Sequence, residues 1–287
     1  MHSFRAGRRT PRWSDTVGRR EFLHRALVVG GSLSAVGAMA QQRVPSHFDP
    51  SLESIAVAYR STDGRMTTGY LSRPTANETA PGLIVVHDDR GLSDDIRGVA
   101  RTTAAAGYFA IAPDFLSRAG STASFRGVEA DVQEALTQVT TDDIVADSGG
   151  TIAYMKRSGR LEDGKLGAIG VGWGGGAALL TAVQYPEVTA CVMLDADPRQ
   201  DADRLARLNA PLLAIFAGGD EATTESVPRF EEALKASARP YAIEVYPGVQ
   251  RGFHAPSSGD RYNAEATKNA WTQILQHVGA YVNGDGR

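Results

Sequence analysis

The chain has 287 residues, of which 42% are hydrophobic and 22% are charged, a globular composition with room for one large α/β domain or two small ones. Seven of the 30 basic residues but only two of the 33 acidic residues lie in 1–40, so residues 41–287 carry a net charge of −8. Such a surface repels nucleic acid and anionic membranes. We therefore expect a small-molecule partner, no nucleic acid and no stable membrane insertion; the oligomeric state is left open.

The first forty residues have the layout of a cleavable export signal. Arg19 and Arg20 precede a short apolar run rich in Gly and Ala, which ends in the small-x-small sequence Ala38-Met39-Ala40. The arginine pair resembles a twin-arginine signal, the bacterial type that exports folded proteins. The run is shorter than the roughly 20 residues of a membrane-spanning helix, which favours export over anchoring.

This interpretation divides the chain into three parts. We expect a removable signal at 1–40, a polar linker at 41–53 and a single domain at 54–287, located in the periplasm or secreted. The single cysteine, Cys191, excludes an intrachain disulfide and lies in the apolar run ACVML, which predicts a buried, unreactive thiol.

The domain begins with a predicted hairpin and continues as alternating strands and helices. The alternating runs IAVAYRS and TTGYLSR flank Asp63-Gly64, a strong turn signal. Near-continuous apolar strands separated by amphipathic helices predict a parallel sheet with helices on both faces. The expected strands are 82–87, 108–115, 166–171, 190–194, 211–217 and 241–246, and the expected helices include 128–137, one from Thr141, and 264–281.

The sequence IGVGWGGG at 169–176 is consistent with two kinds of site. Gly170, Gly172 and Gly175 have dinucleotide-binding spacing, and Asp195 follows at the distance of a ribose-binding acid. However, three or more strands precede this turn, whereas a dinucleotide fold usually places it after its first strand. An exported protein would also have to carry its cofactor with it.

The same letters fit a nucleophile elbow, a sharp strand-to-helix turn with glycines two residues before and after its central residue. Gly170 and Gly174 fill these flanking places, and Gly172 takes the central one. Asp220 follows a later strand and His254 lies in a loop before the last helix, the chain order of a hydrolase acid and base. This order favours the elbow.

The segments 85–115 and 246–271 resemble the dienelactone hydrolase family, and the resemblance extends from about Ile55 to the last helix. VVHDDRGLSDDIRGVARTTAAAGYFAIAPDF is similar to that family's first active-site loop, helix and A-P-D strand. YPGVQRGFHAPSSGDRYNAEATKNAW is similar to its histidine loop. The resemblance implies an α/β-hydrolase fold: a mainly parallel sheet, helices on both faces and an N-terminal antiparallel hairpin.

The resemblance also implies roles for individual residues. Asp220 and His254 match the acid and base of the triad, and Gly172 stands where the family has its cysteine nucleophile. The oxyanion donors would be the backbone N–H groups of Trp173 and Asp89. Asp88 stands at a glutamate position of the family, and Arg90 matches; both are assigned to substrate binding.

Three functions are consistent with these residues. The first is hydrolysis of small esters or lactones, with His254 and Asp220 activating water in place of the nucleophile. The second is non-catalytic binding of a small carboxylate or lactone, with Arg90 and the oxyanion donors as the anchors. The third, more remote, is dinucleotide-dependent oxidoreduction.

Two further possibilities concern other side chains. A hydroxyl from the insertion could replace the nucleophile; the candidates are Ser117, Ser121, Thr122 and Ser124. His87, Asp88 and Asp89 could suggest a metal site, but no second histidine lies at ligand spacing. We therefore expect no metal and no cofactor.

Overall fold

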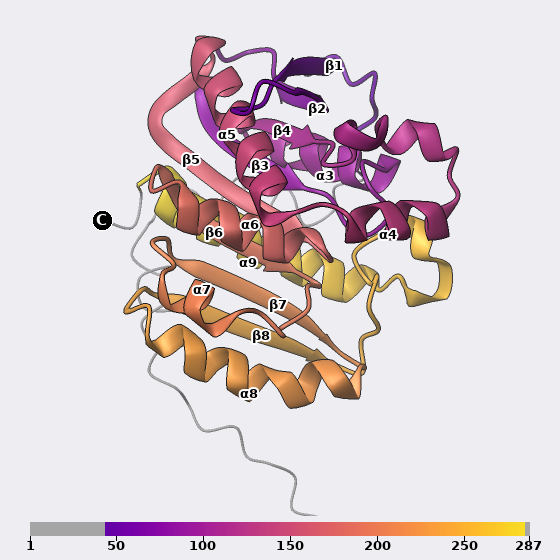
Figure 1. Cartoon of the computed structure of the whole chain (residues 1–287), viewed down its shortest axis with the longest axis vertical. Helices are drawn as coiled ribbons and strands as arrows, with labels where there is room; N and C mark the ends of the chain where they lie inside the picture. The colour runs from indigo at the N-terminus through magenta and orange to yellow at the C-terminus, as the bar shows by residue number, and fades with distance from the viewer. Residues whose placement is uncertain (1–43, 285–287) are drawn as a thin grey trace, which may run out of the picture.

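The computed structural model describes residues 44–284, and the predicted export signal lies outside this range. One eight-stranded sheet in the order β1-β2-β4-β3-β5-β6-β7-β8 runs through the molecule (Figure 1). The strands are β1 (Leu52–Arg60), β2 (Met66–Pro74), β3 (Ala80–Val86), β4 (Phe109–Pro113), β5 (Leu161–Val171), β6 (Val188–Leu194), β7 (Leu212–Gly218) and β8 (Tyr241–Pro247).

The predicted hairpin is confirmed, since β1 and β2 pair antiparallel around Asp63-Gly64. β2 also pairs antiparallel with β4, and all pairings from β4 to β8 are parallel. β1 begins at Leu52, two residues before the expected domain boundary. The expected linker packs on the domain from residue 44 onward, with the Arg101 Nε donating to the Pro45 carbonyl at 2.6 Å.

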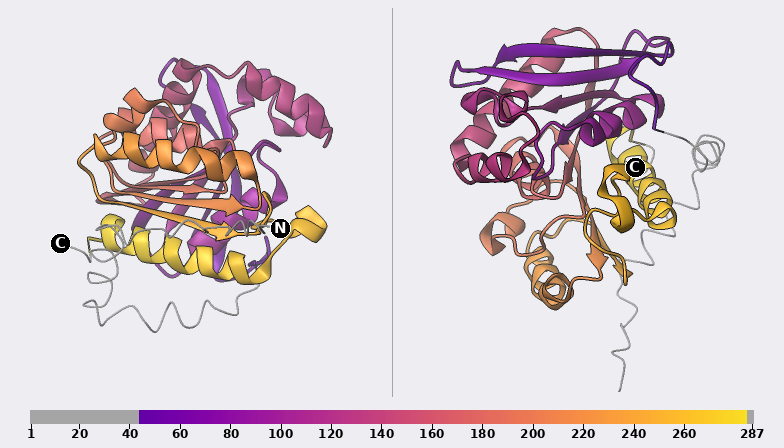
Figure 2. Two further views of the ribbon diagram at one scale, coloured as in Figure 1. Left: turned by 90° about the horizontal axis from the view of Figure 1, so that it is seen from below. Right: turned by 90° about the vertical axis from the view of Figure 1, so that its right-hand side faces the viewer.

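Helices cover both faces of the sheet, as Figure 2 shows in its left view. α3 and α9 pack on one face, and α5, α6 and α8 pack on the other. The helices are α3 (Asp94–Ala105), α4 (Glu129–Thr137), α5 (Thr141–Arg157), α6 (Gly174–Gln184), α7 (Ala202–Ala206), α8 (Glu221–Lys235) and α9 (Ala264–Val282), with 3-10 turns η1 (Ser117–Ala119), η2 (Thr122–Phe125) and η3 (Pro256–Arg261).

The two-sided core follows from the period of a strand. Ile84 and Val86 of β3 face one helical layer, while Leu83 and Val85 face the other, because successive side chains point to opposite faces. All four are fully buried. Burial on both faces explains why the sequences of the parallel strands are continuous apolar runs. Among the described helices, none combines the length and the apolar character needed to cross a membrane.

The parallel strands all end at one edge of the sheet, where side chains of chemical interest follow them. Asp88 follows β3, Gly172 follows β5 and Asp195 follows β6. The loops after β7 and β8 add Asp220 and His254. In open parallel sheets this edge is the usual position of a ligand site.

Candidate active site

The turn between β5 and α6 is sharp because its glycines leave no room for side chains. Gly172 has φ +54°, in the left-handed region, and its N–H donates to the Leu194 carbonyl at 2.9 Å. A Cβ on Gly170 would collide with the backbone of Gly174, and a Cβ on Gly174 would collide with the His87 carbonyl. The structure therefore has the backbone of an elbow, with Gly172 at its tip.

The space beside Gly172 is bordered by the first loop. A Cβ on Gly172 would lie 3.2 Å from the Cβ of Asp88, and apart from the residues adjacent in the chain, Asp88 supplies the described atoms within 4 Å. Any side chain at position 172 would therefore extend alongside Asp88. The tip of the turn contributes backbone to the site and no functional group.

Asp88 and Arg90 bind each other. The buried Asp88 carboxylate accepts from the Arg90 Nη2 at 2.7 Å, the Arg90 Nε at 3.1 Å and the Arg90 backbone N–H at 3.0 Å. Arg90 also lies 3.1 Å from Asp95 and donates to the Ser257 hydroxyl at 2.6 Å. Both residues predicted to bind substrate thus have their charges satisfied within the protein.

Asp89 and Trp173 supply the predicted oxyanion donors. Within residues 44–284, neither backbone N–H is hydrogen-bonded to another residue. Partial burial and the neighbouring carboxylates of Asp88 and Glu129 raise the pKa of Asp89 above its usual value. The Asp89 N–H also contacts its own carboxyl group, whereas no hydrogen bond from the Trp173 N–H is present among the described residues, so the Trp173 N–H can donate to an oxygen of a ligand.

Trp173 is half-buried in an aromatic group at the start of α6. Its ring stacks on His87 with 5.5 Å between centroids, and Phe115 lies 6.0 Å away. His87 has partners at both ring nitrogens: Nδ1 lies 2.9 Å from the Asp88 carbonyl, and Nε2 accepts from the Phe115 N–H at 3.1 Å. His87 is thus a structural residue, and the described residues contain no cluster suited to a metal ion.

His254 is paired with Asp195, an acid that the sequence interpretation assigned to the alternative dinucleotide site. The His254 Nδ1 lies 3.5 Å from the Asp195 Oδ2, and each side chain is only 5% exposed. The same oxygen accepts the Gly252 N–H at 2.5 Å. Because this carboxylate is engaged internally and buried, it is not placed to bind a ribose.

Several polar atoms of this pair are buried without a hydrogen-bond partner among the described residues. They are the Oδ1 of Asp195 and both ring nitrogens of His254. Asp195 itself has φ +54°, a strained conformation for a residue with a side chain. Unsatisfied buried atoms and local strain are typical of functional sites.

Among the described residues, no hydrogen bond or ion pair joins Asp220 to His254, so the predicted acid–base contact is not made in this structure. Asp220 caps α8: its carboxylate accepts the Ala222 N–H at 3.2 Å and the Thr223 hydroxyl at 2.6 Å. The hydrogen bond from Thr223 lowers the pKa of Asp220. Asp220 is therefore bound to its own helix, and the acid next to His254 comes from the preceding strand end.

Arg251 is a site residue that the sequence interpretation missed. Its Nη2 donates to the Asp195 carbonyl at 3.4 Å. The pKa values of Asp197 and Asp220 are lowered mainly by hydrogen bonds from Arg199 and Thr223, and the charge of Arg251 contributes in the same direction. An arginine three residues before a candidate catalytic histidine was the only sequence signal for it.

Three of the four hydroxyl groups proposed as replacements for the nucleophile are hydrogen-bonded to other residues. The Thr122 Oγ1 accepts from the Leu92 N–H at 2.9 Å and donates to Asp114 at 2.8 Å. Ser117 donates to the Asp114 carbonyl, and Ser124 donates to Ser121. Within the described residues, none of the four hydroxyls is hydrogen-bonded to His254.

The sheet order, the two helical layers and the elbow at the carboxyl edge define an α/β-hydrolase fold, as the sequence predicted. The chain matches the Dienelactone hydrolase family over residues 67–282, and it belongs to that family.

Named relatives share this family over most of their length. A "Putative carboxymethylenebutenolidase" of Methylorubrum extorquens is 28% identical over 284 residues, covering 96% of this chain and 97% of the relative. One of Salmonella typhi, with the same name, is 29% identical over 267 residues, covering 84% and 98%. These relatives are named as hydrolases.

Solved structures support the same fold. A structure described as a putative dienelactone hydrolase from Klebsiella pneumoniae has a TM-score of 0.72 and 26% identity, covering 80% of this chain and all of that one. A dienelactone hydrolase-like promiscuous phosphotriesterase, P91, from metagenomic libraries has a TM-score of 0.64 and 19% identity, covering 79% and 98%. The second resemblance concerns the fold alone.

Proposed function

We propose that this protein binds small neutral esters or lactones at the β5–α6 turn and does not form a covalent acyl intermediate. The observation that carries the proposal is Gly172 at the tip of the elbow. Acyl transfer through an enzyme-bound intermediate needs an attacking oxygen or sulfur at this position. Of the four hydroxyls considered as replacements, those of Ser117, Thr122 and Ser124 are hydrogen-bonded to other residues, and none of the four is hydrogen-bonded to His254.

Binding is supported by two backbone donors that, among the described residues, donate to no other residue. The N–H groups of Asp89 and Trp173 come from the two loops that border Gly172. Hydrogen bonds from both to one carbonyl oxygen would hold an ester or lactone over the glycine. Each donor belongs to the backbone, so the absence of a side chain at position 172 leaves it in place.

The charges around the turn favour a neutral ligand over a carboxylate. Arg90 is paired with Asp88, and Arg199 is paired with Asp197. Arg251 donates to the Asp195 carbonyl. A ligand carboxylate would add another negative charge to this acidic surface.

A second candidate function is hydrolysis by water, with His254 as the general base and Asp195 as its orienting partner. The buried His254–Asp195 pair favours this candidate. The burial of both ring nitrogens weighs against it, because a general base must contact the water that it deprotonates. Binding without turnover is therefore our first choice.

Calorimetry with dihydrocoumarin, a neutral lactone, tests the proposal. We expect saturable binding that weakens markedly in Gly172→Trp, whose side chain would fill the space beside Asp88. The ring-opened acid, 3-(2-hydroxyphenyl)propanoate, should bind more weakly. An absence of heat with this lactone and with small esters such as ethyl acetate would contradict the proposal.

A turnover assay on p-nitrophenyl acetate separates the two candidates. The binding proposal predicts that the wild-type rate equals that of His254→Ala. A wild-type rate that falls in both His254→Ala and Asp195→Asn, but not in Asp220→Asn, would instead establish water-dependent hydrolysis. The two aspartate variants are compared because Asp195 lies next to His254, whereas Asp220 caps α8.

We also propose that residues 1–40 direct export through the twin-arginine route. The support is the sequence of residues 19–40 and the single cysteine of the chain. Burial raises the pKa of Cys191 to about 12, which suits a thiol that stays unreactive outside the cytoplasm. Changing Arg19 and Arg20 to Lys should retain the precursor in the cytoplasm of a bacterial host; unchanged export would contradict this proposal.

A further inference from the structure

A groove is lined by residues of the β1–β2 hairpin, of α3 and of the loop before α3; Figure 1 shows the position of these elements in the fold. Its volume is about 590 Å³, within the range of small-molecule sites. Leu92 and Asp94 contribute to the wall that α3 and its preceding loop form. None of the residues assigned to the β5–α6 turn lines this groove, so it is a separate feature.

Part of the groove is apolar and open to solvent. Ile55 lies near the start of the edge strand β1 and is 43% exposed, which is unusual for a large aliphatic side chain in a strand. Ala56 and Leu92 extend the apolar lining beside it. A ligand with a hydrocarbon body would cover this surface and gain the free energy of burying it.

Two guanidinium groups form the polar end of the groove. Arg97 and Arg101 lie 5.9 and 5.8 Å from the centroid of the Tyr70 ring. Arg101 is held in place, because its Nε donates to the Pro45 carbonyl at 2.6 Å and its Nη1 to the Tyr70 hydroxyl at 3.2 Å. His47 contacts the same hydroxyl at 2.9 Å.

Arg97 lacks an equivalent set of partners. Its Nη1 lies 3.2 Å from Asp94, whose side chain is 94% exposed, and such exposed pairs are weak. Its Nε is buried and has no acceptor among the described residues. A buried donor without an acceptor is costly, and a carboxylate is the acceptor that best fits a guanidinium fork.

We propose that this groove binds small organic acids that have an apolar body and one carboxylate. The carboxylate accepts from the terminal guanidinium nitrogens of Arg97, whose side chain is 40% exposed, and the hydrocarbon body lies against Ile55, Ala56 and Leu92. The charged or titratable groups that line the groove are His47, Tyr70, Asp94, Arg97 and Arg101. The two arginines outnumber the single carboxylate of Asp94, in contrast to the acidic surroundings of the β5–α6 turn.

Calorimetry on the full chain with octanoate, 1-octanol and octylamine tests this proposal. We expect one saturable octanoate site, about ten-fold weaker binding of octanol and no binding of octylamine. Arg97→Gln keeps a polar side chain without the charge and should weaken octanoate binding at least ten-fold. Ile55→Asp, at an exposed position, should weaken it similarly, whereas Arg229→Gln on the exposed face of α8 should have no effect.

Three results would overturn the assignment. One is an absence of saturable octanoate binding, and another is equal binding by wild type and Arg97→Gln. The third is octanoate binding that survives Arg97→Gln but is lost in Arg251→Gln, which would place the acid at the β5–α6 turn. Failure of lactone binding at that turn would leave the groove proposal unaffected, because the two sites share none of the assigned residues.

Discussion

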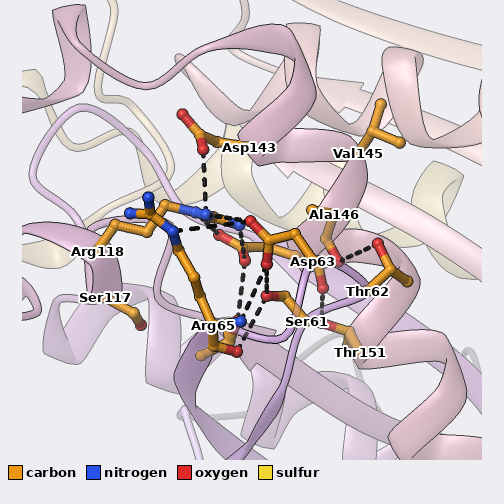
Figure 3. Close-up of polar contacts among 12 residues, drawn as sticks. Ser61, Thr62, Asp63, Arg65, Ser117, Arg118, Asp143, Val145, Ala146 and Thr151 are labelled. Atoms are coloured by element: carbon orange, nitrogen blue, oxygen red, sulfur yellow. Dashed lines mark hydrogen bonds and ion pairs between the residues drawn. The ribbon is translucent and has the colours of Figure 1, made fainter.

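Two polar clusters of this protein differ in how completely their atoms are paired. The Arg118 cluster, shown in Figure 3, joins the β1–β2 turn, η1 and α5. The Arg118 Nη1 lies 2.6 Å from Asp63 and 3.2 Å from Asp143, and its Nη2 lies 2.9 Å from Asp147. The His254–Asp195 pair instead leaves three buried atoms without hydrogen bonds.

This difference in pairing indicates that the Arg118 cluster is structural and that the His254–Asp195 pair belongs to a functional site. Burial raises the pKa of Asp147, and its hydrogen bonds from Arg118 and Thr67 oppose this rise. That carboxylate is therefore compensated within the fold. The incompletely paired atoms of His254 and Asp195 are the feature that marks a functional region, so we assign function to the less completely paired cluster.

The largest effect is expected from Arg118→Ala. This change leaves Asp147, whose side chain is 1% exposed, without its cationic partner. We expect a loss of about 3–5 kcal/mol in the free energy of unfolding, because an uncompensated buried charge remains. Urea unfolding measures it, with Arg229→Ala as the exposed control. A loss below about 1 kcal/mol would show that the cluster is not structural.

His277 provides a buried basic group outside both clusters. Its Nε2 lies 3.3 Å from the Pro211 carbonyl, and burial lowers its pKa to about 4. In the unfolded chain the imidazole of His277 binds a proton near pH 6.5, whereas in the folded protein it stays neutral until about pH 4. The folded state is therefore fully stable with respect to this group above about pH 6.5 and loses stability as the pH falls toward 4. We expect protonation of His277 in the unfolded chain to lower the free energy of unfolding by about 2 kcal/mol when the pH falls from about 7.5 to 5.

The matched variant for this prediction is His277→Gln, whose amide can still donate to Pro211. Urea unfolding at both pH values should show a smaller acid loss in His277→Gln than in wild type, by about 2 kcal/mol. Equal losses in the two proteins would show that His277 titrates normally in the folded state.

A smaller effect tests the backbone of the β5–α6 turn. Gly172→Ala places a Cβ at φ +54° and 3.2 Å from the Asp88 Cβ, and we expect a loss of about 1–2 kcal/mol. Gly159→Ala is the control, since Gly159 has φ +67° with nothing within 4 Å of the added Cβ. A thermal unfolding series should show the greater loss for Gly172→Ala; the reverse order would contradict the close approach of Asp88.

The smallest expected effect on stability comes from changes to Asp220, and it tests whether Asp220 acts as a helix cap, unlike Asp195. Asp220→Ala removes the cap of α8 and should cost about 1 kcal/mol, whereas Asp220→Asn, which retains a capping oxygen, should be nearly neutral. Neither change should alter lactone affinity at the turn. A loss of affinity in Asp220→Asn would return Asp220 to the site and contradict its assignment as a cap.

The sequence was sufficient to predict the hairpin, the parallel strands and the sharp glycine turn. Each depends on local properties: apolar runs of strand length, Asp63-Gly64 between alternating segments, and glycines whose added Cβ atoms would meet nearby backbone. The carboxyl edge of the sheet followed from the order of strands and helices, because right-handed crossovers place all the strand ends together.

Only the tertiary structure decided which acid meets His254. Asp195 and Asp220 follow adjacent parallel strands, so their sequence positions are nearly equivalent. The difference comes from side-chain direction: Asp220 turns back to cap α8, while the strained backbone of Asp195 directs its carboxylate toward His254. The pairing of Arg90 with Asp88 and the groove beside Arg97 likewise depend on contacts between separate segments, which sequence periodicity does not encode.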